Sequence, residues 1–108
     1  MAGQPAKTSY AGGQNSVDAD GRVVGSTVGE QASQALRNLT TVLESKGASL
    51  ANIVHWSIAV VDGHALDEGF AAFQQAWNPA GPPSAITVHV VDGLGPGFLV
   101  EIDAIAVV

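Results

Sequence analysis

The residues that could do chemistry in this chain are few, and they do not group into a familiar catalytic set. The absence of cysteine excludes a thiolate nucleophile and a cysteine-ligated metal. His55, His64 and His89 are scattered along the sequence, so we expect no metal triad and no bound metal. His55 and His89 lie in strand patterns, which favours a structural role over general acid–base chemistry. Ser84 has no identifiable base beside it to activate a nucleophilic hydroxyl.

The charge balance argues against an anionic partner. The formal net charge is −6, and only four residues are cationic: Lys7, Arg22, Arg37 and Lys46. Because nucleic-acid binding needs clustered cations to neutralise phosphates, we expect no nucleic-acid partner. An anionic membrane surface is disfavoured for the same reason. The N-terminus has no apolar stretch of the signal-peptide type, so we expect a cytoplasmic location.

The composition indicates a single domain with a partner. Residues 1–108 fit one domain, with residues 1–6 as a loose end. Hydrophobic residues make up 46% of the chain and charged residues only 13%, against about 25% charged in typical domains. We therefore expect apolar surface that another copy of the chain covers.

The spacing of apolar residues predicts two helices. Positions 32–43 carry apolar side chains at helical spacing. Ser26 or Thr27 can cap the start of this helix, and Glu30 lies favourably near its first turn. The second helix is predicted from about 65 to 77, where prolines prevent it from continuing.

Five strands are predicted around these helices, in the order ββαβαββ. Gly12-Gly13-Gln14 is expected to end the first strand, and the turn at 18–21 leads to a short returning strand. In the last strand, one set of alternate residues is apolar and faces a core. We predict an α+β fold with both helices on one face of a mixed sheet. The expected strands are 7–11, 22–24, 53–61, 85–91 and 98–107.

Several short motifs follow one another along the chain. They are 10–14, 31–32 with 35–39, 42–44 with 47–50, 53–54 with 61–62, and 98–106. In their order and spacing they resemble the RidA family, also called YjgF/YER057c/UK114. The similarity covers about residues 8–108 and rests on the set of motifs, since no single one is decisive.

This resemblance implies a chorismate-mutase-like fold, a homotrimer and a ligand cleft between neighbouring subunits. Members of the family hydrolyse reactive imines or enamines, such as 2-aminoacrylate, to keto acids and ammonia. They use no metal or organic cofactor, so we expect none here. An arginine near the start of the penultimate strand anchors the substrate carboxylate, and a glutamate in the last strand helps to hold the water.

The resemblance assigns site residues position by position. Glu101 matches the water-positioning glutamate and is the expected catalytic residue. The arginine is absent, and Ser84 or Ala85 stands at its position, depending on where the gap is placed. The other expected substrate-binding residues are Gly13, Tyr10, Asp67 and Phe70.

Loss of the arginine changes the expected ligand. An arginine grips a carboxylate through two charge-assisted hydrogen bonds, which serine cannot reproduce. We therefore expect a neutral or cationic small molecule in the cleft. The leading hypothesis is an imine or enamine hydrolase with a shifted substrate. The alternatives are a non-catalytic ligand-binding or regulatory trimer and, more weakly given the acidic balance, an endoribonuclease.

Overall fold

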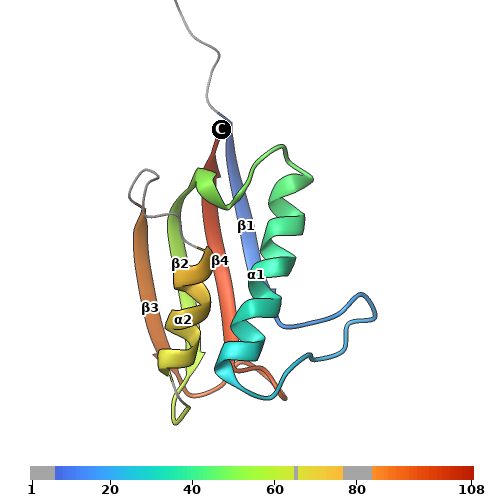
Figure 1. Cartoon of the computed structure of the whole chain (residues 1–108), viewed down its shortest axis with the longest axis vertical. Coiled ribbons are helices and arrows are strands. Elements are labelled where there is room, and N and C mark those ends of the chain that lie inside the picture. The colour runs from blue at the N-terminus through green and yellow to red at the C-terminus, as the bar shows by residue number, and fades with distance from the viewer. Residues whose placement is uncertain (1–6, 65, 77–83) are drawn as a thin grey trace, which may run out of the picture.

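The chain folds into a four-stranded sheet with two helices on one face (Figure 1). A computed structural model describes residues 7–64, 66–76 and 84–108. The expected loose end at 1–6 lies outside the described residues, and so do the prolines after the second helix. The elements are β1 (Thr8–Asn15), α1 (Val28–Glu44), a 3₁₀ turn η1 (Leu50–Asn52), β2 (Ile53–Val61), α2 (Leu66–Ala76), β3 (Ala85–Val91) and β4 (Val100–Val107).

The sheet is mixed, as predicted, and its last strand in the sequence is a central one. The strand order is β1-β4-β2-β3. β4 runs antiparallel to both of its neighbours, β1 and β2. β2 and β3 are parallel, which requires a crossover, and α2 supplies it. β1 and β3 form the two edges of the sheet.

The core lies between the helices and one face of the sheet. The apolar residues of β4 at 100, 102, 104 and 106 are buried, which confirms the predicted alternation. Trp56, Ile58 and Val60 of β2 lie on the same face. α1 covers these residues with the predicted apolar stripe. Its buried apolar members are Val28, Ala32, Ala35, Leu36, Leu39 and Leu43.

The predicted returning strand at 22–24 is wrong in extent. The turn forms, since the Asp18 carboxylate accepts hydrogen bonds from backbone N–H groups beyond it. However, only one isolated bridge, between Val17 and Val23, pairs the two arms. The Asn38 side chain on α1 donates to the carbonyls of Asn15 and Val17, both at 2.9 Å. These hydrogen bonds hold the residues after β1 against α1. Because residues 22–24 form no strand, the observed order of elements is βαβαββ.

Two strand boundaries also differ from expectation. β1 does not end at Gly12 but continues to Asn15, because an irregularity in its pairing with β4 between Ala11 and Gln14 accommodates the glycines. β4 begins at Val100 and not at 98, because the N–H of Leu99 bonds to a side chain on α1.

The start of α1 is capped by its own side chains, as predicted. Thr27 is the N-cap, and its Oγ1 accepts a hydrogen bond of 3.1 Å from the N–H of Glu30. Glu30 reaches back, and its Oε1 accepts from the N–H of Ser26 at 3.2 Å. This reciprocal pairing satisfies backbone donors that a helix leaves free. The Ser26 N–H and the Thr27 hydroxyl hold the pKa of the Glu30 carboxyl below its ordinary value.

The Glu30 cap is expected to make the stability of α1 depend on pH. Because the folded pKa is lower than the ordinary 4.5, the contribution is present at neutral pH and is lost as the pH falls through the folded pKa. Glu30→Gln should therefore lower the thermal unfolding midpoint at pH 7, and the difference from wild type should shrink in acid. Circular dichroism melts across this range measure the effect.

The matched control is Glu44→Gln, which removes the same charge from the other end of α1. If this variant lost stability with the same pH dependence, general charge removal and not the N-terminal cap would be responsible.

Candidate functional site

The candidate chemistry lies on the face of the sheet that carries no helix, here called the open face. Side chains alternate between the two faces of a strand, so the residues between the buried positions point to the open face. Cross-strand pairing then places them in rows. Asp103 pairs with Ser57, which pairs with Thr87, and Glu101 pairs with Ala59, which pairs with His89.

The structure places Glu101 and Gly13 side by side on the open face. Glu101 lies on central β4, between Ala59 of β2 and Asn15 of β1. A Cβ atom at position 13 would lie only 2.8 Å from the Glu101 Cδ and closer still to its Oε1. Only glycine leaves this space, so the carboxylate rests against the β1 backbone. There it can accept protons from a bound water or ligand.

The two positions expected to replace the arginine lie far from Glu101 in the same chain. Ala85 is the first residue of edge strand β3 and pairs with His55. It lies two strands across and four residues along the sheet from Glu101, a separation of about 16 Å at ordinary strand spacings. Ser84 precedes it. A site that used both Glu101 and this position would have to take them from two copies of the chain.

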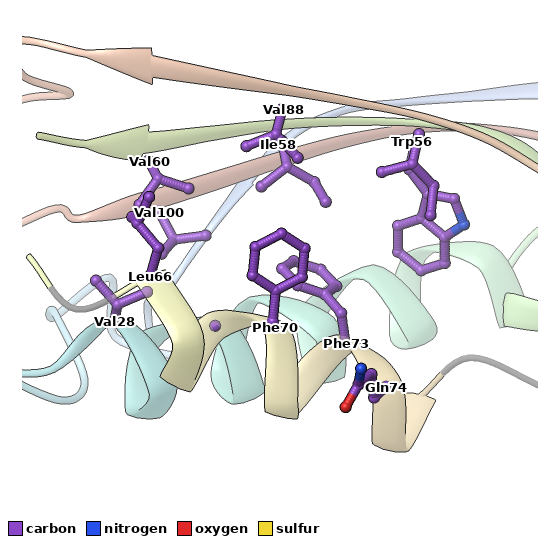
Figure 2. Close-up of a pocket in the computed structure, with 12 residues that line it drawn as sticks. Val28, Trp56, Ile58, Val60, Leu66, Phe70, Phe73, Gln74, Val88 and Val100 are labelled. Atoms are coloured by element: carbon purple, nitrogen blue, oxygen red, sulfur yellow. The ribbon is translucent and has the colours of Figure 1, made fainter.

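The remaining expected site residues are also dispersed. Tyr10 is 79% exposed on the open face, where it pairs with Ile105, four residues along β4 from Glu101. Asp67 and Phe70 lie on α2, and therefore on the opposite side of the sheet. Phe70 is 56% exposed and lines an apolar pocket there (Figure 2). Within one chain, neither contributes to the surroundings of Glu101.

The strands that form the open face present carboxylates and no strong cation. None of the four strands contains lysine or arginine. Glu101 and Asp103 supply two carboxylates, and His55 and His89 supply two imidazoles. His55 Nε2 lies 3.4 Å from the Thr87 hydroxyl. Within the described ranges, no group of three or more histidine, cysteine, aspartate or glutamate side chains is arranged to hold a metal ion.

Gln31 fixes the loop that leads into β4, a role that the sequence analysis did not assign. Its side chain is 1% exposed, and its Nε2 donates to the carbonyls of Gly25 at 3.1 Å and Gly97 at 2.8 Å. Its Oε1 accepts from the N–H of Leu99 at 2.8 Å, two residues before Glu101. The sequence did contain a signal for this role: Gln31 lies among the apolar residues of the α1 stripe. An amide buried at such a position needs hydrogen-bond partners.

Known proteins share both the sequence and the fold. A family model described as endoribonuclease L-PSP matches residues 2–108. Over 102 residues the chain is 32% identical to 2-iminobutanoate/2-iminopropanoate deaminase of Bos taurus, covering 94% of this chain and 73% of that protein. It is 36% identical to the mitochondrial protein mmf1 of Schizosaccharomyces pombe, covering 90% of this chain and 60% of that one.

Solved structures agree with these matches. The crystal structure of YyfB from Yersinia pestis, of the conserved Rid protein family, aligns with a TM-score of 0.83 at 30% identity. The alignment covers 94% of this chain and 79% of YyfB. Rv2704 from Mycobacterium tuberculosis, of the YjgF/YER057c/UK114 family, aligns with a TM-score of 0.79 at 28% identity, covering 94% and 79% of the two chains. In the part of this chain that the structure describes, no helix has the length and apolar character to cross a bilayer.

The close approach of Gly13 and Glu101 predicts opposite outcomes for two neighbouring glycines. Gly13→Ala should displace the Glu101 carboxylate, whereas nothing lies within 4 Å of a Cβ at Gly12. The chemical shift of the Glu101 carboxyl carbon, measured by NMR, should change in the first variant and not in Gly12→Ala. The free energy of unfolding should change by less than about 1 kcal/mol, because the end of the glutamate side chain can rotate away. An unchanged shift in Gly13→Ala would contradict the contact.

Proposed function

The chain belongs to the RidA (YjgF/YER057c/UK114) family, and on that premise we propose that it is a cofactor-independent imine or enamine deaminase. Its four-stranded mixed sheet with two helices is the chorismate-mutase-like α+β fold. The observation that carries the proposal is the Glu101 carboxylate held against Gly13 on the open face. Relatives about 30% identical to this chain are named as imine deaminases.

The proposed reaction needs one carboxylate and one water molecule. Glu101 accepts a proton from the water as its oxygen attacks the C=N carbon, and it passes this proton to the imine nitrogen. The resulting carbinolamine carries oxygen and nitrogen on the same carbon. In its collapse Glu101 takes the proton of the hydroxyl group as the C=O bond forms, and it gives this proton to the nitrogen as the C–N bond breaks and ammonia leaves. The carboxylate is regenerated, so no other reactant is required.

We propose that the functional unit is a homotrimer with its site between copies. Within one chain, Ala85 is about 16 Å from Glu101, and Ser84 is farther still. Apolar side chains also reach the open face, and Tyr10 is 79% exposed there. If copies of the chain packed through their open faces, the apolar surface there would be covered. The same packing would bring the start of β3 of one copy near Glu101 of the next. The family resemblance favours the same arrangement.

The proposed substrate is a neutral or cationic imine. The strands of the sheet carry two outward carboxylates and no lysine or arginine. An anionic substrate would lack the bidentate partner that an arginine gives, and it would also face Glu101 and Asp103. A substrate without a carboxylate avoids both costs.

Two other functions compete with this proposal. A non-catalytic ligand-binding trimer would use the same surface without turnover. An endoribonuclease would agree with the description of the family model, but phosphate binding is opposed by a net charge of −6 and only four cations. The cytoplasmic location stays a prediction, since the relative mmf1 is described as mitochondrial.

Removal of the Glu101 charge is expected to lower turnover strongly while leaving the assembly intact. Glu101→Gln should lower kcat by about a hundredfold or more, because a positioned general base contributes that much. Asp103→Asn is the matched control, since it removes a carboxylate two residues along the same face. Ammonia release from a panel of imines measures activity, and light scattering should give a mass of three chains for all variants. Equal losses in both variants, or a monomeric wild type, would contradict the proposal.

Restoring a cation at the start of β3 is expected to change the substrate preference. The wild type should hydrolyse neutral imines faster than 2-aminoacrylate. Ser84→Arg or Ala85→Arg should lower KM for 2-aminoacrylate by roughly tenfold to a hundredfold, the effect of one hydrogen bond to a charged group. Ser84→Met, which adds length without charge, should not.

Each contrary result has a distinct meaning. Efficient turnover of 2-aminoacrylate by the wild type would show that another group anchors the carboxylate. If no variant acts on any member of the panel, the ligand-binding trimer replaces the enzyme as the leading function.

A further inference from the structure

An apolar pocket of about 260 Å³ lies between α2 and the sheet, on the face opposite to Glu101 (Figure 2). Its floor is formed by the buried side chains of Trp56, Ile58 and Val60 on β2. Phe70 and Phe73 of α2 point into it, toward Ile58, in Figure 2. No residue of the proposed deaminase site near Glu101 and Gly13 lines it.

Among the described residues, α2 packs closely against α1 and does not cover β3, and the pocket lies in the space that this leaves. A Cβ at Gly69 would lie 3.0 Å from Val28 Cγ1, and a Cβ at Gly29 would lie 3.0 Å from Glu68 Cβ. These glycines let the two helices approach each other at their N-terminal ends. On β3, the side chains that face the helices remain 52% exposed at Ile86 and 41% exposed at Val88. A gap is therefore left between α2 and the edge of the sheet.

The chemistry of the lining selects for an uncharged ring. Among the described residues around the pocket none is charged, and Gln74 carries the polar side chain. Trp56 and Phe73 meet edge to face, with ring centroids 6.1 Å apart, and Phe70 offers a third ring. Aromatic rings prefer such edge and offset contacts with other rings. A charged group would lose its hydration here without gaining a partner.

The volume sets the size of the ligand. A dry apolar cavity of about 150 Å³ is enough to bind benzene in a protein. The pocket is larger than that and opens toward β3, where Val88 and Ile86 are partly exposed. It therefore has room for one aromatic ring with a small substituent.

We propose that this pocket is a second ligand site, which binds a small uncharged aromatic molecule through Phe70, Phe73 and the apolar side chains of β2 and β3. It is separated from the open face by the sheet, so it is independent of the proposed deaminase function. Gln74 can accept or donate one hydrogen bond to a polar substituent of the ligand.

The test uses the full chain and three probes of similar size: toluene, p-cresol and benzoate. Titration calorimetry with NMR shift mapping should show saturable binding of toluene and p-cresol, with one molecule per chain. Benzoate should bind at least about tenfold more weakly, because its charge would be buried without a partner. Val88→Trp should fill the pocket and remove binding.

The matched control is Val90→Trp, which adds the same ring on the same face of β3, at a residue outside the pocket lining. It should leave the dissociation constant for toluene unchanged. Phe70→Ala, at a half-exposed position that folding tolerates, should weaken binding and serves as the second variant if Val88→Trp fails to fold.

Three outcomes would overturn the proposal. The first is no saturable binding of toluene or p-cresol. The second is binding that benzoate matches, or that both Val88→Trp and Phe70→Ala leave intact. The third is binding that occurs only as light scattering shows the assembly dissociating, since a second copy of the chain would then be the natural occupant of the groove.

Discussion

The alternation of side chains along β4 is the constraint on which the rest of the structure depends. β4 is paired on both sides, so its register with β1 and β2 is fixed by two ladders of hydrogen bonds. A slip of one residue would turn Val100 and Ile102 out to the open face and bury Glu101 under α1. Burial of the apolar set is strongly favourable, whereas burial of an unpaired carboxylate is costly. The same energetics that form the core therefore present Glu101 outward.

The polar residues of α1 extend this constraint to the loops. Gln31 holds the segment before β4, and Asn38 holds the end of β1 and the residues that follow. Each side chain makes hydrogen bonds to backbone groups that are not paired with a neighbouring strand. These loops are therefore held in place without an additional strand. Both ends of the backbone around Glu101 and Gly13 are thus fixed from the far side of the sheet.

The sheet also separates two chemically different surfaces. The open face carries carboxylates and histidines, while the pocket beneath α2 is lined by rings and aliphatic groups. Close approach of the helices at Gly29 and Gly69 opens the second surface, and the glycine at 13 opens the first. In both cases a missing Cβ, and not an added functional group, makes the space available.

Local patterns in the sequence determined the elements whose signals are local. Spacing and residue type predicted the bounds of β2 and β3, a helix cap at Ser26 or Thr27 with Glu30 nearby, and the alternation of β4. The resemblance to the RidA family gave the fold and singled out Glu101 and Gly13. The helix, strand and cap signals depend on residues a few positions apart, so the sequence alone can carry them.

Only the tertiary structure decided the features that rest on pairing between distant segments. The pairing irregularity at Ala11–Gln14, the single bridge at Val17 and Val23, and the contact of Gly13 with Glu101 each depend on register between strands or contacts with α1. The separation of Ala85 from Glu101 likewise follows from strand order, and the pocket from the placement of α2. Such contacts join residues far apart in the chain, and their geometry is set by the packing of the whole domain, which no local periodicity encodes.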